Sequence, residues 1–162
     1  MADPHPHRSR LVALDYGEAR IGVAGSDALG ILAHPLETVA AQPRGGAITR
    51  IAAIVRERKA AGIVVGLPLR ADGEEGAAAE KVRAFAEALR AHLPAGCPIY
   101  FQDEYRSTVQ AAEHLRASGK RTKTHRPLID QAAAVVILQD YLDALPEDFP
   151  SAPSDEAPGA DL

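Results

Sequence analysis

The chain has 162 residues, of which 46% are hydrophobic and 25% charged, and its formal net charge is -4. This balance is typical of one globular domain that buries its own core. No run approaches the roughly 18 uncharged apolar residues of a membrane helix, and the first ten residues lack the apolar centre of a signal peptide, so we expect a cytoplasmic protein without membrane contact. The single cysteine, Cys97, excludes an intrachain disulfide.

The negative charge is concentrated at the C-terminal end. Six acids and no Lys or Arg follow Leu142, which leaves 18 basic against 16 acidic groups in the rest of the chain. Residues 144–162 are rich in Pro, Ala and Ser and cannot bury enough surface to offset the entropy lost on ordering. We therefore expect a flexible N-terminus over residues 1–8, one domain over residues 9–143 and a disordered acidic tail over residues 144–162.

The expected elements alternate between strands and helices. Three runs joined by short turns predict antiparallel strands at Leu11 to Tyr16, Arg20 to Ser26 and Pro35 to Val39. Apolar residues at helical spacing from Ile48 to Val55 predict a helix that ends before Gly62. The remaining expected elements are a strand at Ile63 to Gly66, a helix at about Gly76 to His92, a strand at Ile99 to Asp103, and helices at about Thr108 to Ser118 and Ile129 to Leu142.

Three antiparallel strands followed by helix-separated parallel strands is the order of the ribonuclease H-like fold. In this α/β architecture a mixed five-stranded sheet carries helices on both faces. Topology alone does not fix a function, so the chemistry has to come from individual residues.

Asp15 stands at the end of the first expected strand and is followed by Tyr16 and Gly17. Asp is unfavourable in a strand and costly to bury unpaired, so it needs a partner such as a metal, a helix N-terminus or a basic side chain. The alternative is a hairpin turn, where Asp and Gly are both favoured. Two later acids in comparable positions favour the metal.

The second acid is one of the pair Asp103 and Glu104, at the C-terminal edge of the fifth strand. Open α/β sheets collect their ligands at this edge. Neighbours on a strand face opposite sides, so we expect only one of the two to face Asp15. We favour Glu104, with Asp103 as the alternative, although both could be ordinary acids that precede a helix.

The third acid, Asp130, stands at the head of the last expected helix, where an acid stabilises the helix dipole by a few tenths to about 1 kcal/mol. It also shares a helical face with Ala134 and Ile137, and this face should pack on the sheet. The small Ala133 and Ala134 would let the helix come close. Three converging carboxylates suggest magnesium.

These acids lie in four sequence blocks that resemble the signature blocks of the YqgF (RuvX) family of ribonuclease H-like proteins. The blocks are LVALDYGEARIGVAGSD, IVVGLPLRADGEEG, FQDEYRST and IDQAAAVVILQDYL, and they span roughly residues 9 to 143. Members of the family are described as Holliday junction resolvases and, more recently, as nucleases that mature the 5' end of pre-16S ribosomal RNA. Asp15, Glu104 and Asp130 match the acidic triad of the family. The fourth expected strand ends in Gly66, Leu67 and Pro68, the stretch where the related RuvC resolvases place an acid.

The resemblance implies a hydrolase that cuts phosphodiester bonds with two magnesium or manganese ions. Asp15, Glu104 and Asp130 would be both the catalytic residues and the metal ligands, because carboxylates bind hard cations well. The expected substrate is structured RNA, in first place pre-16S rRNA in ribosomal precursor particles, or alternatively branched DNA in recombination and repair. We expect a monomer or a weak homodimer.

Positive charge for a nucleic acid is concentrated directly before the last helix. The expected nucleic-acid-binding residues are Arg116, Lys120, Arg121, Lys123 and Arg126, together with Arg20 and Arg106 from the signature blocks. A charged run is usually solvated surface, but the position of this one before Asp130 favours phosphate contacts.

Two other functions fit parts of the pattern. Asp15, Tyr16 and Gly17 also resemble the first phosphate loop of actin-like ATPases, but those proteins need a duplicated domain, for which this chain is too short. A non-catalytic RNA-binding assembly factor with the same fold stays open. Cleavage assays with the purified protein distinguish it from a nuclease.

Overall fold

The computed structural model describes residues 9–105 and 126–145. The expected flexible N-terminus, the helix expected at Thr108 to Ser118 and almost all of the expected acidic tail lie outside the described residues. The described elements are β1 (Leu11–Tyr16), β2 (Arg20–Ser26), β3 (Ala33–Ala40), α1 (Arg44–Arg58), β4 (Gly62–Leu69), α2 (Ala77–Arg90), β5 (Ile99–Tyr105) and α4 (Arg126–Ala144).

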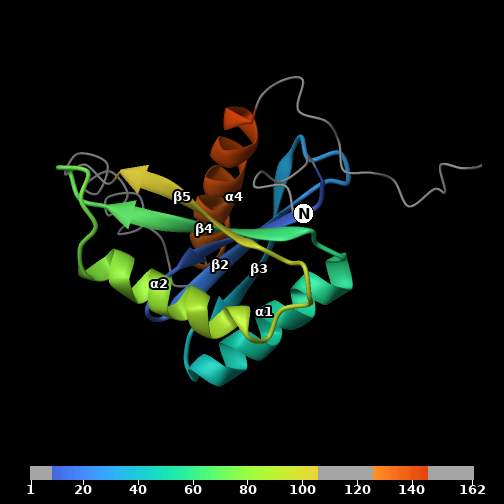
Figure 1. Ribbon diagram of the computed structural model, residues 1–162, viewed down its shortest axis with the longest axis horizontal. Coiled ribbons are helices and arrows are strands. Elements are labelled where there is room, and N and C mark those ends of the chain that lie inside the picture. Colours follow the sequence, from blue (N-terminus) through green and yellow to red (C-terminus); the bar gives the residue numbers. More distant parts are fainter. Residues whose placement is uncertain (1–8, 106–125, 146–162) are drawn as a thin grey trace, which may run out of the picture.

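The five strands form one mixed sheet in the order β3-β2-β1-β4-β5. The pairs β1–β2 and β2–β3 are antiparallel, whereas β1–β4 and β4–β5 are parallel. Helices α1 and α2 cover one face and α4 crosses the other, so the sheet lies between two helical layers (Figure 1). The expected α/β architecture, with helices on both faces of a mixed five-stranded sheet, is confirmed.

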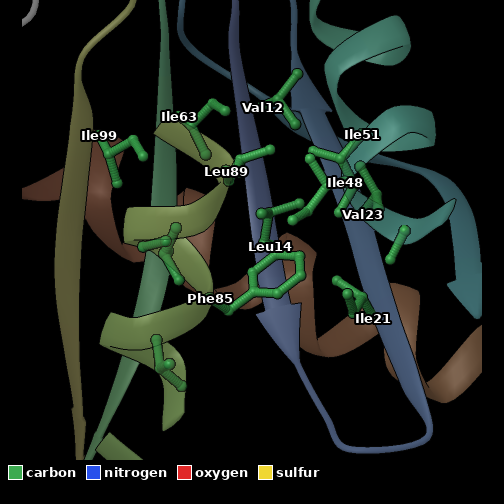
Figure 2. Packing of buried hydrophobic residues seen from close by; sticks show 14 of the residues in the cluster. Val12, Leu14, Ile21, Val23, Ile48, Ile51, Ile63, Phe85, Leu89 and Ile99 are labelled. Atoms are coloured by element: carbon green, nitrogen blue, oxygen red, sulfur yellow. The ribbon is translucent and has the colours of Figure 1, made fainter. Parts of the chain in front are cut away.

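Alternation along β1 divides the core into two layers. Val12 and Leu14 point toward α1 and α2, where Phe85 fills the space between helix and sheet (Figure 2). Leu11 and Ala13 point to the opposite face and pack under α4. Full burial of side chains such as Leu and Phe contributes roughly 1.5–3 kcal/mol each, so the two layers supply most of the driving force for folding.

Strand β4 is longer than the sequence indicated. We expected it to end at Gly66, but it continues to Leu69. Its pairing with β1 stops at Val65, whereas its pairing with β5 continues to Leu69. From Gly66 to Pro68 the strand therefore pairs with β5 alone, and Pro68 can lie in it because an edge position does not need every N–H group.

Helix α4 also begins earlier than expected, at Arg126 and not at Ile129. Pro127 falls in its first turn, where backbone N–H groups lack helical partners and the missing N–H of proline does no harm. As a result the first turn contains no acid, and Asp130 lies in the second turn, away from the position where a helix dipole acts most strongly.

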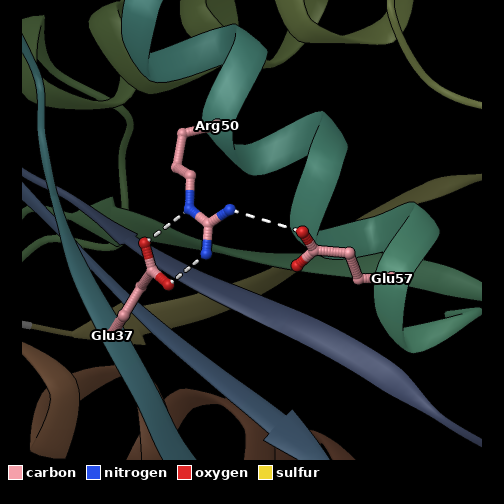
Figure 3. A network of polar contacts seen from close by, with 3 residues as sticks. All are labelled: Glu37, Arg50 and Glu57. Atoms are coloured by element: carbon pink, nitrogen blue, oxygen red, sulfur yellow. Dashed lines mark hydrogen bonds and ion pairs between the residues drawn. The ribbon is translucent and has the colours of Figure 1, made fainter.

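Strand β3 and helix α1 are linked by a polar cluster on the outer surface (Figure 3). Arg50 donates two hydrogen bonds to Glu37, of 2.8 Å from Nε and 2.7 Å from Nη2, and its Nη1 lies 3.5 Å from Oε1 of Glu57. The hydrogen bond from Arg50 lowers the pKa of Glu37.

In residues 9–105 and 126–145, no helix combines the length and hydropathy that a bilayer span requires.

Candidate active site

Asp15 lies where helix α4 comes closest to the sheet. Asp15, in β1, lies directly opposite Gly22 in the antiparallel neighbour β2. A β carbon built on Gly22 would lie only 1.9 Å from the carbonyl oxygen of Asp130, so the backbone of α4 touches β2 at this point. Directly opposed residues of an antiparallel pair point to the same face. The side chain of Asp15 therefore projects on the face of the sheet that carries Asp130.

Strand β5 brings Glu104 to the same face. The ring of Tyr100, earlier in β5, lies 5.9 Å from that of Tyr141 in α4. Alternation along the strand puts Glu104, four residues later, on the side of Tyr100 and hence of α4. The Oε1 atom of Glu104 is shielded from solvent.

Asp103 faces the other way, toward α2. The guanidinium carbon of Arg83 in α2 lies 4.8 Å from the ring centroid of Phe101, two residues before Asp103. The pKa of Arg83 is raised mainly by its hydrogen bond with Glu75 and more weakly by the charge of Asp103. The sheet therefore separates Asp103 from Asp15, whereas Glu104 shares a face with it.

Asp130 is bound to Arg20, the first residue of β2. Nε of Arg20 donates a hydrogen bond of 2.9 Å to Oδ2 of Asp130. The next residue of α4, Gln131, donates from Nε2 to Oγ1 of Thr38 in β3 at 3.1 Å. Two polar contacts and the Gly22 contact thus fix this turn of α4 on the antiparallel half of the sheet. Arg20, expected to bind nucleic acid, contacts a carboxylate of the site in this structure.

The three acids lie on one face of the sheet, near the C-terminal ends of β1 and β5, but they do not come together as a metal-binding group. Strands β1 and β5 are separated by β4, which implies about 10 Å between their backbones. Within the described part of the chain, no three His, Cys, Asp or Glu side chains lie close enough together to hold a metal ion.

The donor chemistry of Asp15, Glu104 and Asp130 nevertheless fits a hard divalent cation, since such ions prefer carboxylate oxygens. A site that used all three would require their side chains to turn toward one another. Oδ2 of Asp130 accepts from Arg20, so a cation bound at Asp130 would either share the carboxylate with Arg20 or displace it.

Gly66, the first residue of the stretch where the resemblance places an acid in related resolvases, is covered by α4. A β carbon on Gly66 would lie 2.5 Å from Cδ1 of Ile137. An acidic side chain at this position would have to displace Ile137, which is buried in the α4 layer. At Gly66 the space for such a side chain is therefore occupied by Ile137.

Most of the expected nucleic-acid-binding residues lie outside the described residues: Arg106, Arg116, Lys120, Arg121 and Lys123. Arg126 begins α4, but its side chain is likewise not described. The described ends that flank this segment are β5, which carries Glu104, and α4, which carries Asp130. The basic run therefore connects two elements of the candidate site.

The sequence analysis missed Gly22 and Gln131 as parts of the site. A signal for Gly22 was present, because a glycine inside a strand often marks a close backbone approach. The contact of Gln131 with Thr38 joins residues 93 positions apart, and no local pattern indicates it.

Comparison with known proteins identifies the family. The model of the family described as "RuvX: Holliday junction resolvase" matches residues 9–144. The chain belongs to the RuvX family. A RuvX relative from Nocardia farcinica is 51% identical over 85% of this chain and 79% of its own length, and one from Streptomyces avermitilis is 48% identical over 85% of this chain and 87% of its own length. The names of both relatives propose a pre-16S rRNA nuclease.

The fold of this RuvX chain is similar to that of RuvC from Thermus thermophilus. In a structure of RuvC in complex with a Holliday junction substrate, the TM-score is 0.51 at 18% identity, over 84% of this chain and 94% of that one. A second structure of the same RuvC gives a TM-score of 0.50 at 16% identity. This likeness supports the ribonuclease H-like fold, which was expected from the order of the strands.

Proposed function

We propose that this nuclease hydrolyses phosphodiester bonds at the 5' end of pre-16S rRNA, in ribosomal precursor particles, and that Asp15, Glu104 and Asp130 carry the reaction. Membership of the RuvX family makes the chain a hydrolase of nucleic-acid esters. The observation that carries the assignment of residues is the common face of the three acids, at the edge of the sheet where parallel strands end.

The proposal includes a divalent metal, magnesium or manganese, held by the three carboxylates. When bound, a pair of such ions makes the attacking water more acidic and stabilises charge on the leaving oxygen. The side chains of the protein have complementary tasks. Asp15 and Glu104 supply negative charge from β1 and β5. The hydrogen bond from Arg20 keeps the Asp130 carboxylate in position in the absence of a metal.

Branched DNA is a second candidate substrate, supported by the description of the family as Holliday junction resolvases. The two candidates share the same chemistry and differ in the shape of the nucleic acid that presents the phosphate. The protein would distinguish these two substrates by the shape of the nucleic acid and by contacts to its backbone, more than by contacts to base edges.

Cleavage by the purified protein tests the proposal. The substrates are an end-labelled RNA that contains the junction between the 5' precursor and mature 16S rRNA, a four-way DNA junction and a linear DNA duplex, each with magnesium, manganese or a chelator. We expect metal-dependent cleavage of the RNA at the junction by the wild type and none by Asp15→Asn. Cleavage of the DNA junction alone would make the protein a resolvase, and binding without cleavage under all conditions would make it an assembly factor.

A further inference from the structure

Three residues that lie side by side across the antiparallel half of the sheet face α4: Asp15 in β1, Gly22 in β2 and Thr38 in β3. The register pairs Asp15 with Gly22, and Gly22 with Thr38. Directly opposed residues of antiparallel strands point to the same face. The turn of α4 that carries Asp130 and Gln131 lies over this row. The row therefore links the place of this turn to the place of Asp15.

Gln131 joins the turn to the outer strand of the row. Its Nε2 donates to Oγ1 of Thr38 at 3.1 Å, and both residues are half-buried. Thr38 is β-branched and belongs to a paired strand, so its hydroxyl group has few positions to choose from. A hydrogen bond has a preferred direction, whereas the apolar packing of α4 on the sheet is non-directional. The contact therefore fixes the orientation of the turn as well as its distance from the sheet.

The other two contacts of this turn act differently. The carbonyl of Asp130 against Gly22 limits how closely α4 approaches β2, but a steric contact does not hold a helix down. Arg20 binds the carboxylate itself, through a long side chain that is 38% exposed, so its guanidinium can move with the carboxylate. The hydrogen bond from Gln131 to Thr38 holds the turn without using the carboxylate. It can therefore persist whichever partner Asp130 has.

A second glutamine, Gln139, ties α4 to the start of β3. Its Nε2 donates to the carbonyl of Ile31 and its Oε1 accepts from the backbone N–H of Ala33, each at 3.0 Å. This contact lies about 12 Å further along the helix than that of Gln131. The first turn of a helix has fewer internal hydrogen bonds than its centre, and α4 begins at Arg126. The second turn of α4 therefore depends more on its own contact with the sheet than on the distant one.

We propose that Gln131 is a positioning residue of the candidate active site: its hydrogen bond to Thr38 seats the second turn of α4 and so holds the Asp130 carboxylate on the side of Asp15. The inference rests on the function proposed for Asp130, because Gln131 acts through that residue. A displacement of about 1 Å at a reacting group can lower a rate by up to about 100-fold. Loss of the contact should therefore slow the chemical step and leave substrate affinity unchanged.

Variants of the two partners test the inference in the RNA cleavage assay. Gln131→Met keeps a long, unbranched side chain but cannot donate, and Thr38→Val keeps the shape of threonine but cannot accept. Each should lower the single-turnover rate at saturating RNA by about 10- to 100-fold, with RNA affinity within about twofold of that of the wild type. Thr38→Ser, which retains the hydroxyl group, should keep most of the rate. The double variant should be no slower than either single variant, because both changes remove the same contact.

Gln139→Met is the matched control, since it removes hydrogen bonds of the same kind at the far end of α4. Both glutamine variants should lower the melting temperature by about 2–6 °C, but only Gln131→Met should slow cleavage. Amide hydrogen exchange, measured without RNA or metal, gives a second readout. Exchange at residues 132–134 should be about tenfold faster in Gln131→Met than in the wild type, and unchanged in Gln139→Met.

The outcomes separate this inference from the proposed function. Cleavage by Asp130→Asn at the wild-type rate would overturn the function proposed for Asp130. If Asp130→Asn is inactive and Gln131→Met cleaves as fast as the wild type, Asp130 is catalytic but Gln131 does not position it. An equal loss of rate in Gln131→Met and Gln139→Met would also overturn the inference, because both variants would then act through the stability of α4 alone.

Discussion

The carbonyl group of Asp130 occupies the space where any residue other than glycine at position 22 would carry its β carbon. This contact joins strand β2 to the second turn of α4, directly across from Asp15. Position 22 therefore sets the height at which the helix lies over the sheet, and with it the position of the Asp130 carboxylate.

The first prediction concerns this contact. Gly22→Ala should lower the free energy of unfolding by about 1–3 kcal/mol, because α4 must move away from the sheet to admit the methyl group. Gly45→Ala is the matched control, since a β carbon at Gly45 meets nothing within 4 Å, and alanine should leave stability unchanged or raise it by up to about 1 kcal/mol. Urea denaturation of both variants makes the measurement. Equal stability of the Gly22 variant and the wild type would show that α4 is not seated on this glycine.

A second prediction is a pH dependence at the surface cluster of Glu37, Arg50 and Glu57. The pKa of Glu37 is lowered from its ordinary value of 4.5 by the hydrogen bond from Arg50, so the stabilisation is fully present above pH 4.5 and is lost as the pH falls through the folded-state pKa. At neutral pH, Arg50→Gln should lower the melting temperature by only about 1–3 °C, because the pair is largely solvated. The difference between variant and wild type should shrink below pH 4.5. A difference that stays constant from pH 7 to pH 3 would contradict this account.

The third prediction separates the two neighbouring acids of β5. Glu104→Gln should abolish cleavage and leave the fold intact, because Glu104 lies on the face of Asp15 and Asp130. Asp103→Asn, one residue away, should keep most of the activity, because Asp103 faces Arg83 on α2. Single-turnover cleavage and circular dichroism of both variants provide the comparison. If Asp103→Asn is inactive and Glu104→Gln is active, the assignment of Glu104 is wrong and Asp103 is the second acid of the site.

The alternation of strands and helices along the chain was sufficient to predict a mixed five-stranded sheet with helices on both faces, but not the order β3-β2-β1-β4-β5 of the strands in it. The same pattern left Asp103 and Glu104 as alternatives. It shows that side chains alternate between the two faces along β5, but it does not show which residues of β5 share a face with Asp15. The contact between the rings of Tyr100 and Tyr141 decides this, because it places Tyr100, and therefore Glu104, on the α4 face. The contact of Arg20 with Asp130 joins residues 110 positions apart and depends on how α4 is seated, which no local pattern contains.

A fourth prediction addresses the basic run, which lies outside the described residues. Changing Lys120, Arg121 and Lys123 together to Ala should weaken binding to all nucleic-acid sequences alike and lower the slope of log affinity against log salt concentration by up to about 3. The matched control changes three exposed cations elsewhere, Arg44 and Arg56 of α1 and Arg90 of α2. Fluorescence anisotropy at several salt concentrations compares the two triple variants. If both lose the same affinity, the run acts through net charge and not through contact.

The last prediction follows from the ion pair between Arg20 and Asp130. Because Arg20 holds the carboxylate at 2.9 Å and adds a positive charge beside the site, it competes with a divalent cation for Asp130. Arg20→Gln should therefore raise the affinity for manganese, measured by calorimetry without nucleic acid, by on the order of 3- to 10-fold. The same change should lower the free energy of unfolding by about 0.5–1 kcal/mol in the absence of metal. Arg44→Gln is the control, because Arg44 donates to the carbonyl of Ala84 at 2.7 Å in the layer of α1 and α2, across the sheet from Asp130, and it should leave the manganese affinity unchanged. Unchanged or weaker manganese binding by Arg20→Gln would mean that Arg20 does not compete for Asp130, and its role would then lie with the phosphate of the substrate.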